Sequence, residues 1–113
     1  MIASRVLQIV NDSGPSTPLE VRIYQPVVED RSWACHYDID WPNGPRKSAA
    51  HGVDSVQAIN LAMTKIGAEL YASDYHARGQ LVFEKPGNGY GFPVPRPMRD
   101  ALVGDDAKFG GGA

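Results

Sequence analysis

The chain has 113 residues, the usual size of one domain. Its apolar fraction of 42% and its charged fraction of 21% are those of an ordinary globular protein. A net charge of −2, with no cluster of basic residues, argues against a nucleic-acid-binding surface. No stretch approaches the ~20 apolar residues of a membrane span or the apolar run of a signal peptide. We therefore expect a soluble, cytoplasmic protein that has no membrane partner.

The first two strands that the sequence predicts lie at residues 2–10 and 19–28. Residues 2–10 are aliphatic and β-branched, with apolar side chains on both faces of the predicted strand. Residues 11–18 are dense in turn-forming residues and predict a loop. Apolar and polar side chains alternate over 19–28, where Pro26 interrupts the strand or places it at an edge.

The clearest strand signal runs through residues 32–41. One face of this strand holds the apolar set Trp33, Cys35, Tyr37, Ile39 and Trp41. The other face holds Ser32, Ala34, His36, Asp38 and Asp40. Because this period of two is not helical, the segment predicts a strand with one apolar and one polar face. The turn at 41–45 then leads to a shorter, weaker strand at 46–52.

One amphipathic helix is predicted over about residues 54–72. Asp54 is a favourable N-cap residue, and Gln57 stands at the third helical position, where it completes a capping pair. The apolar residues recur at helical spacing and form one stripe: Val56, Ile59, Ala62, Met63, Ile66 and Leu70. After the helix we expect a short strand at 80–84 and a Pro/Gly-rich loop at 85–97.

These elements predict an α+β fold: an antiparallel sheet of four or five strands in the order β-β-β-β-α-β, with the one amphipathic helix packed on one face. Residues 1–95 are expected to form the single domain and residues 96–113 a flexible C-terminal tail. The expected core comprises Val21, Ile23, Trp33, Cys35, Tyr37, Ile39, Val56, Ile59, Met63, Ile66, Leu70, Leu81 and Phe83.

Three segments of the chain carry a family resemblance. They are SWACHYDIDWP (32–42), GVDSVQAI (52–59) and GFP (91–93). The chain resembles, over about residues 20–93, a family of small bacterial proteins described as a domain of unknown function. The specific pieces are the Trp-x-Cys-x-Tyr strand and the Asp-Ser-x-Gln-Ala helix start. The resemblance implies no activity, substrate or site residues.

The polar face of the 32–41 strand is the first candidate site. His36, Asp38 and Asp40 share one side of the strand, about 6.6 Å apart at each step. A histidine beside two carboxylates can act as acid and base or bind a divalent metal. The sequence favours the alternative, a solvated polar face of a half-covered sheet, because no spaced His or Cys partners complete a metal site. We therefore assign no metal ligands.

The other conspicuous residues favour structural roles. Cys35 alternates into the apolar face and is expected in the core, and as the single cysteine it excludes an internal disulfide. His51 and His76 lie near the two ends of the helical segment and are interpreted as surface or loop histidines. The Gly-rich string at 87–91 is not a phosphate loop, because the prolines that follow it forbid the helix such a loop requires.

The outer face of the predicted helix carries few charges. Leu61 and Ala68 lie roughly opposite the apolar stripe, one heptad apart. Cover by the C-terminal segment 98–103 or by a second subunit would explain this pattern, and so would apolar residues scattered on an ordinary surface. We name Leu61 and Ala68 as candidate interface residues.

Two classes of function stay open. The sequence favours a small non-catalytic interaction or binding domain, which acts through self-association or a protein partner, because no catalytic motif is present. The alternative is a small metal-dependent or acid–base enzyme built around His36, Asp38 and Asp40. The sequence does not decide between them, and it predicts no cofactor.

Overall fold

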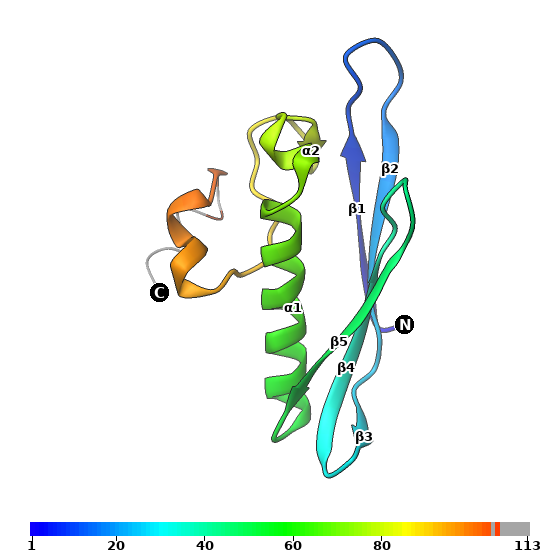
Figure 1. Ribbon diagram of the computed structural model, residues 1–113, viewed down its shortest axis with the longest axis vertical. Helices are drawn as coiled ribbons and strands as arrows, with labels where there is room; N and C mark the ends of the chain where they lie inside the picture. The colour runs from blue at the N-terminus through cyan, green and yellow to red at the C-terminus, as the bar shows by residue number, and fades with distance from the viewer. Residues whose placement is uncertain (105, 107–113) are drawn as a thin grey trace.

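The computed structural model describes residues 1–104 and residue 106 (Figure 1). Within this part of the chain, five strands precede one main helix and a sixth follows it, in the predicted α+β fold. The strands are β1 (Ala3–Ile9), β2 (Thr17–Ile23), β3 (Val27–Glu29), β4 (Ser32–Ile39), β5 (Arg46–Gly52) and β6 (Leu81–Val82). The helices are α1 (Ser55–Tyr71), the short α2 (Asp74–Ala77) and the 3-10 helix η1 (Arg96–Ala101).

All six strands form one antiparallel sheet. From one edge to the other its order is β5, β4, β2, β1 and β6, and β3 pairs with β4 on the same side as β2. Pro26 lies between β2 and β3. Because proline has no backbone N–H, it interrupts the hydrogen-bond ladder there, and the predicted 19–28 strand becomes two. The sheet therefore has six strands where the sequence predicts four or five.

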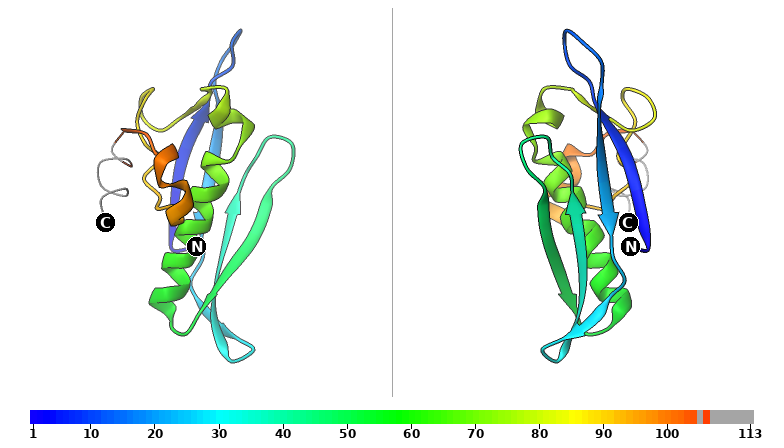
Figure 2. Two further views of the ribbon diagram at one scale, coloured as in Figure 1. Left: turned by 60° about the vertical axis from the view of Figure 1, so that its left-hand side comes forward. Right: turned by 90° about the vertical axis from the view of Figure 1, so that its right-hand side faces the viewer.

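The main core lies between the sheet and α1, which covers one face of the sheet (Figures 1 and 2). The sheet contributes the buried side chains Leu7, Ile9, Leu19, Val21, Ile23, Cys35, Tyr37, Ile39 and Leu81. The helix contributes Ala58, Ala62, Ile66, Gly67, Leu70 and Tyr71. The apolar face predicted for the 32–41 strand, now β4, is thus confirmed as buried for Cys35, Tyr37 and Ile39. Trp33 and Trp41 are only partly buried, at the margin of this core.

The prediction is wrong for one residue of the expected core. Val56, in the first turn of α1, is 73% exposed. On the helix it lies about 160° from Ala58, given ~100° per residue, and so points away from the sheet. Further along α1, another segment of the chain covers the side of the helix on which Val56 lies, but that segment does not reach the first turn. Ile59, Met63 and Phe83, also expected in the core, are partly buried.

That covering segment is residues 89–104 together with residue 106, which lie along the helix on the side away from β5 (Figure 1). Its buried side chains are Tyr90, Phe92, Val94 and Leu102. Gly67 of α1 permits the close approach, because a Cβ at this position would lie 1.9 Å from the Pro93 carbonyl oxygen. A polar contact then fixes the end of the segment: the carboxylate of Asp106 accepts hydrogen bonds from the backbone N–H groups of Tyr90 at 2.7 Å and Gly91 at 2.8 Å.

The Tyr71 hydroxyl of α1 donates a third hydrogen bond to Asp106, at 2.5 Å. Asp106 is 8% exposed and belongs to the stretch that we expected to be a flexible tail. Leu102 of the same stretch is also buried and packs against the core. Residue 105 and residues 107–113 lie outside the described residues.

Candidate functional site

The polar face of the sheet carries the three side chains that the sequence singled out, but their contacts separate them. Asp38 and Asp40 pair with Arg22 of the neighbouring strand: the guanidinium lies 3.5 Å from Asp38 and makes two contacts of 3.1 Å with Asp40. Arg22 also hydrogen-bonds to Glu20, and this bond is the largest cause of the raised pKa of the guanidinium, to which Asp40 also contributes. The carboxylates of both aspartates are therefore engaged in ion pairs with Arg22.

Asp38 is further engaged by Tyr24, whose hydroxyl donates to Oδ2 at 2.5 Å. This hydrogen bond raises the pKa of the Tyr24 hydroxyl. His36 belongs to a different group, because its Nε2 lies 2.8 Å from Glu29 and His51 approaches the same carboxylate at 3.8 Å. Among the described residues, no three or more His, Cys, Asp or Glu side chains are placed to hold a metal ion.

Cys35 and His76 also have structural surroundings. Cys35 is fully buried, burial raises the pKa of its thiol, and its Sγ lies 3.4 Å from the Tyr24 carbonyl oxygen. His76 Nδ1 lies 2.6 Å from the hydroxyl of Tyr90, a residue of the covering segment. Burial lowers the pKa of His76 and raises the pKa of Tyr90 to about 12. Burial therefore disfavours the charged form of each group.

The arrangement that best fits a binding function is the outer edge of β1. The backbone N–H of Tyr24 and the backbone C=O of Glu20 hydrogen-bond to β4. Backbone groups alternate in direction along a strand, so those of the odd-numbered residues of β2 point toward β1. The backbone groups of the even-numbered residues of β1 therefore point away from β2, to the outer edge. On that outer side β6 pairs with Gln8 and Ile9 alone. Among residues 1–98, 102–104 and 106, the outward N–H and C=O groups of Ser4 and Val6 have no hydrogen-bond partner.

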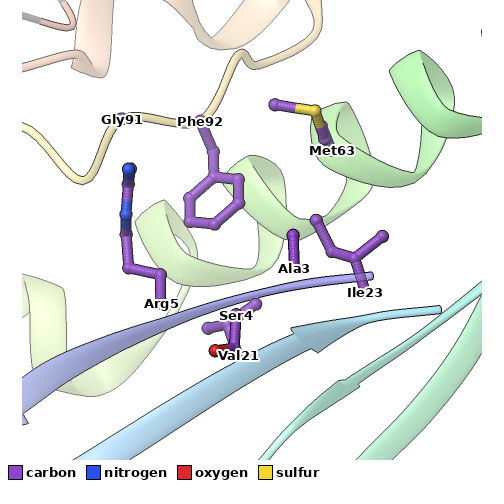
Figure 3. A pocket seen from close by; sticks show the side chains of 8 residues that line it. All are labelled: Ala3, Ser4, Arg5, Val21, Ile23, Met63, Gly91 and Phe92. Carbon is purple, nitrogen blue, oxygen red and sulfur yellow. The ribbon is translucent and has the colours of Figure 1, made fainter. Parts of the chain in front are cut away.

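A pocket of about 170 Å³ lies directly beside this edge (Figure 3). Its lining residues come from β1, β2, α1 and the covering segment: Ala3, Ser4, Arg5, Val21, Ile23, Met63, Gly91 and Phe92. Figure 3 shows the Phe92 ring and Met63 above the strands, with Ala3 and Ile23 below them. Most of these side chains are apolar, so the pocket suits an apolar group.

Arg5 is the charged residue of the pocket wall. As an odd-numbered residue of β1, it shares the inner face with Leu7 and Ile9. Its guanidinium carbon lies 4.3 Å from the centre of the Phe83 ring and 5.4 Å from that of Phe92, in cation–π contact. Its Nη1 donates to the Tyr90 carbonyl oxygen at 2.9 Å. These contacts hold the guanidinium at the pocket.

Neither Arg5 nor Phe92 was predicted as a site residue from the sequence. A signal for Arg5 was present, because a charged residue at the inner-facing position of an otherwise apolar set is unusual. No comparable signal marked Phe92, which lies in a loop far from β1 in the sequence. The candidate interface residues remain untested predictions: Leu61 is 38% exposed, and Ala68 is partly buried.

Comparisons with known proteins place the chain in a wider group. The model of a family described as "Domain of unknown function (DUF6968)" matches residues 3–94, which include every strand, α1 and the pocket. No curated protein and no solved structure matches the chain. No helix in the described part of the chain is long and apolar enough to cross a membrane.

Proposed function

The chain belongs to the family described as Domain of unknown function (DUF6968). We propose that it is a non-catalytic interaction domain. It binds an extended segment of a protein partner, which adds to the sheet as a strand along the outer edge of β1. The observation that carries the proposal is the position of the unpaired backbone groups of Ser4 and Val6 beside an apolar pocket.

Strand addition uses these two features together. Backbone hydrogen bonds to the edge supply affinity, and pockets for alternate side chains supply specificity. Ser4 and Val6 offer two N–H donors and two C=O acceptors to a partner strand. The side chains of Ile2 and Val6, 53% and 47% exposed, lie on the sheet face opposite the pocket. A partner strand therefore meets apolar surface with both of its faces.

The size of the pocket fits one apolar side chain. A dry cavity of about 150 Å³ binds a molecule as large as benzene. The pocket beside β1, at about 170 Å³, can accept a leucine-sized or phenyl group. Burial of such a group contributes about 1.5–3 kcal/mol, enough to select one residue type within an extended segment.

The proposal is tested with a proline substitution that removes one outward donor. Ser4→Pro deletes the N–H that faces the partner and leaves the β1–β2 ladder intact, because prolines are tolerated on the open side of an edge strand. Peptides are first selected on the native protein from a phage-displayed library of random short sequences. We expect Ser4→Pro to weaken their binding by about tenfold or more.

The matched control is Ala49→Pro on β5, at the opposite edge. The N–H of Ala49 also points outward, because the backbone hydrogen bonds to β4 are made by the even-numbered residues of β5. Peptide binding that Ala49→Pro preserves and Ser4→Pro weakens supports the proposal. Binding that neither variant changes, or that only Ala49→Pro removes, contradicts it. A native dimer that Ser4→Pro dissociates makes a second copy of the chain the partner.

A further inference from the structure

Arg5 adds a chemical preference to the proposed site. Its guanidinium is partly buried between two aromatic rings, and one of its nitrogen atoms donates to the Tyr90 carbonyl oxygen. Among residues 1–98, 102–104 and 106, whose side chains the structure describes, no carboxylate lies within 4.0 Å of it. A guanidinium has five N–H donors, so most of its hydrogen-bonding capacity is available beside the pocket.

The surroundings of Arg5 hold the group in place. A Cβ at Gly91 would lie 2.0 Å from Arg5 Nη1, so the glycine leaves the space that the guanidinium occupies. Figure 3 shows the Arg5 side chain extended along the pocket wall beside Phe92 and toward Gly91. An arginine fixed in this way loses little conformational entropy when it binds an anion, and its planar fork matches a carboxylate.

We propose that the bound segment carries an acidic side chain two positions from the apolar residue that enters the pocket, and that its carboxylate pairs with Arg5. The inference rests on the proposed function, because it concerns the same edge. Side chains two positions apart in a strand share one face, and Arg5 lies on the face that holds the pocket. Charge complementarity favours such a segment over a neutral one, since the pair forms at a partly desolvated surface.

Three matched peptides of alternating valine and threonine, each with one leucine, test the inference. The first has a glutamate two positions before the leucine and an amidated C-terminus. The second has a glutamine in its place and an amidated C-terminus. The third has the same glutamine and ends at the leucine with a free terminal carboxylate. We expect the first to bind the native protein about tenfold more tightly than the second at low ionic strength. Tighter binding of the third peptide alone overturns the acidic side chain and assigns the carboxylate to a chain terminus.

Salt and Arg5 variants complete the test. The advantage of the carboxylate peptide is expected to shrink as salt is added, because the pair is partly exposed. Arg5→Gln is expected to remove the advantage and Arg5→Lys to keep part of it. Arg31→Gln, at an exposed position in the β3–β4 turn, is the control for loss of a positive charge.

The outcomes separate the two proposals. Equal binding of all three peptides by the native protein overturns the carboxylate preference and leaves strand addition standing. A preference that Arg5→Gln does not reduce also overturns the assignment to Arg5. If peptides selected from random sequences fail to bind the β1 edge, the proposed function fails, and this inference fails with it.

Discussion

The β1 edge and the β5 edge of the sheet both present outward backbone groups, but their side chains treat those groups differently. At β5, Lys65 of α1 donates to the Ala49 carbonyl oxygen at 2.7 Å and lies 3.3 Å from the Ser48 hydroxyl. Arg46 and Lys47 are exposed at the start of the same strand. At β1, the exposed side chains beside the outward groups are Ile2, Ser4 and Val6, none of which is charged.

This difference indicates which edge is a binding surface. Lysine and other charged residues on an edge strand prevent pairing with other chains. The β5 edge has this protection, whereas the first half of the β1 edge has apolar residues and a pocket in its place. An edge left open in this way is a hazard for aggregation unless it has a partner.

The β1 side of the core depends on the covering segment. Phe92→Ala removes a ring that is 6% exposed and forms part of the pocket wall. We expect the free energy of unfolding, measured by urea denaturation, to fall by about 3–5 kcal/mol. Leu61→Ala, one helical turn before Lys65 near the β5 side, is the comparison, with an expected loss of less than about 1 kcal/mol. Equal losses would mean that the segment is not part of the core.

The Asp106 carboxylate holds the covering segment by its hydrogen bonds to Tyr90 and Gly91. Asp106→Asn replaces one acceptor oxygen with an NH₂ group that faces other donors. We expect a loss of about 1–3 kcal/mol of unfolding free energy and faster amide exchange at Tyr90 and Gly91. Asp12→Asn, in the exposed β1–β2 loop, is the control. Unchanged exchange at both amides would contradict this role.

These two predictions concern a region that the sequence revealed poorly. Strict alternation in residues 32–41 and the spacing of Ile66 and Leu70 were sufficient to predict the sheet and the helix, because these patterns depend on local geometry. The contacts of Phe92 and Asp106 join positions far apart in the chain and depend on a loop path that has no period. Periodicity therefore predicts the covered sheet but not the cover at its β1 side.

The candidate site shows the same limit. The alternation correctly placed His36, Asp38 and Asp40 on one face, but it could not identify Arg22 and Glu29 as the partners that divide them. Those partners depend on strand register, which the sequence of one strand does not determine. The alternation also could not indicate which strand edge would be left open, because that depends on the short length of β6.

The protection of β5 can be removed by one substitution. Lys65→Met keeps the length of the side chain and removes the donor to the Ala49 carbonyl oxygen. We expect a loss of about 0.5–1 kcal/mol of unfolding free energy and new self-association in sedimentation velocity experiments. Lys85→Met, at an exposed loop position, is the control. If Lys65→Met stays as monodisperse as the native protein, Lys65 does not protect the edge.

The smallest effect expected is a change in how stability depends on pH. Burial lowers the pKa of His76 in the folded protein, so the unfolded chain binds a proton more readily. The free energy of unfolding is therefore unaffected by protonation of His76 above the unfolded pKa of about 6.5. It falls as the pH drops through that value toward the pKa of the folded protein. In urea titrations, His76→Gln should weaken this dependence, with His51→Gln as control. An unchanged slope would exclude His76 as a source.

Amide hydrogen exchange followed by NMR tests the difference between the two edges most directly. The native protein is measured alone and with a saturating peptide selected from the random library. The account predicts slower exchange at the amides of Ser4 and Val6, with unchanged exchange at Lys47, Ala49 and His51. Protection at the three β5 amides, or none at Ser4 and Val6 despite bound peptide, would contradict it.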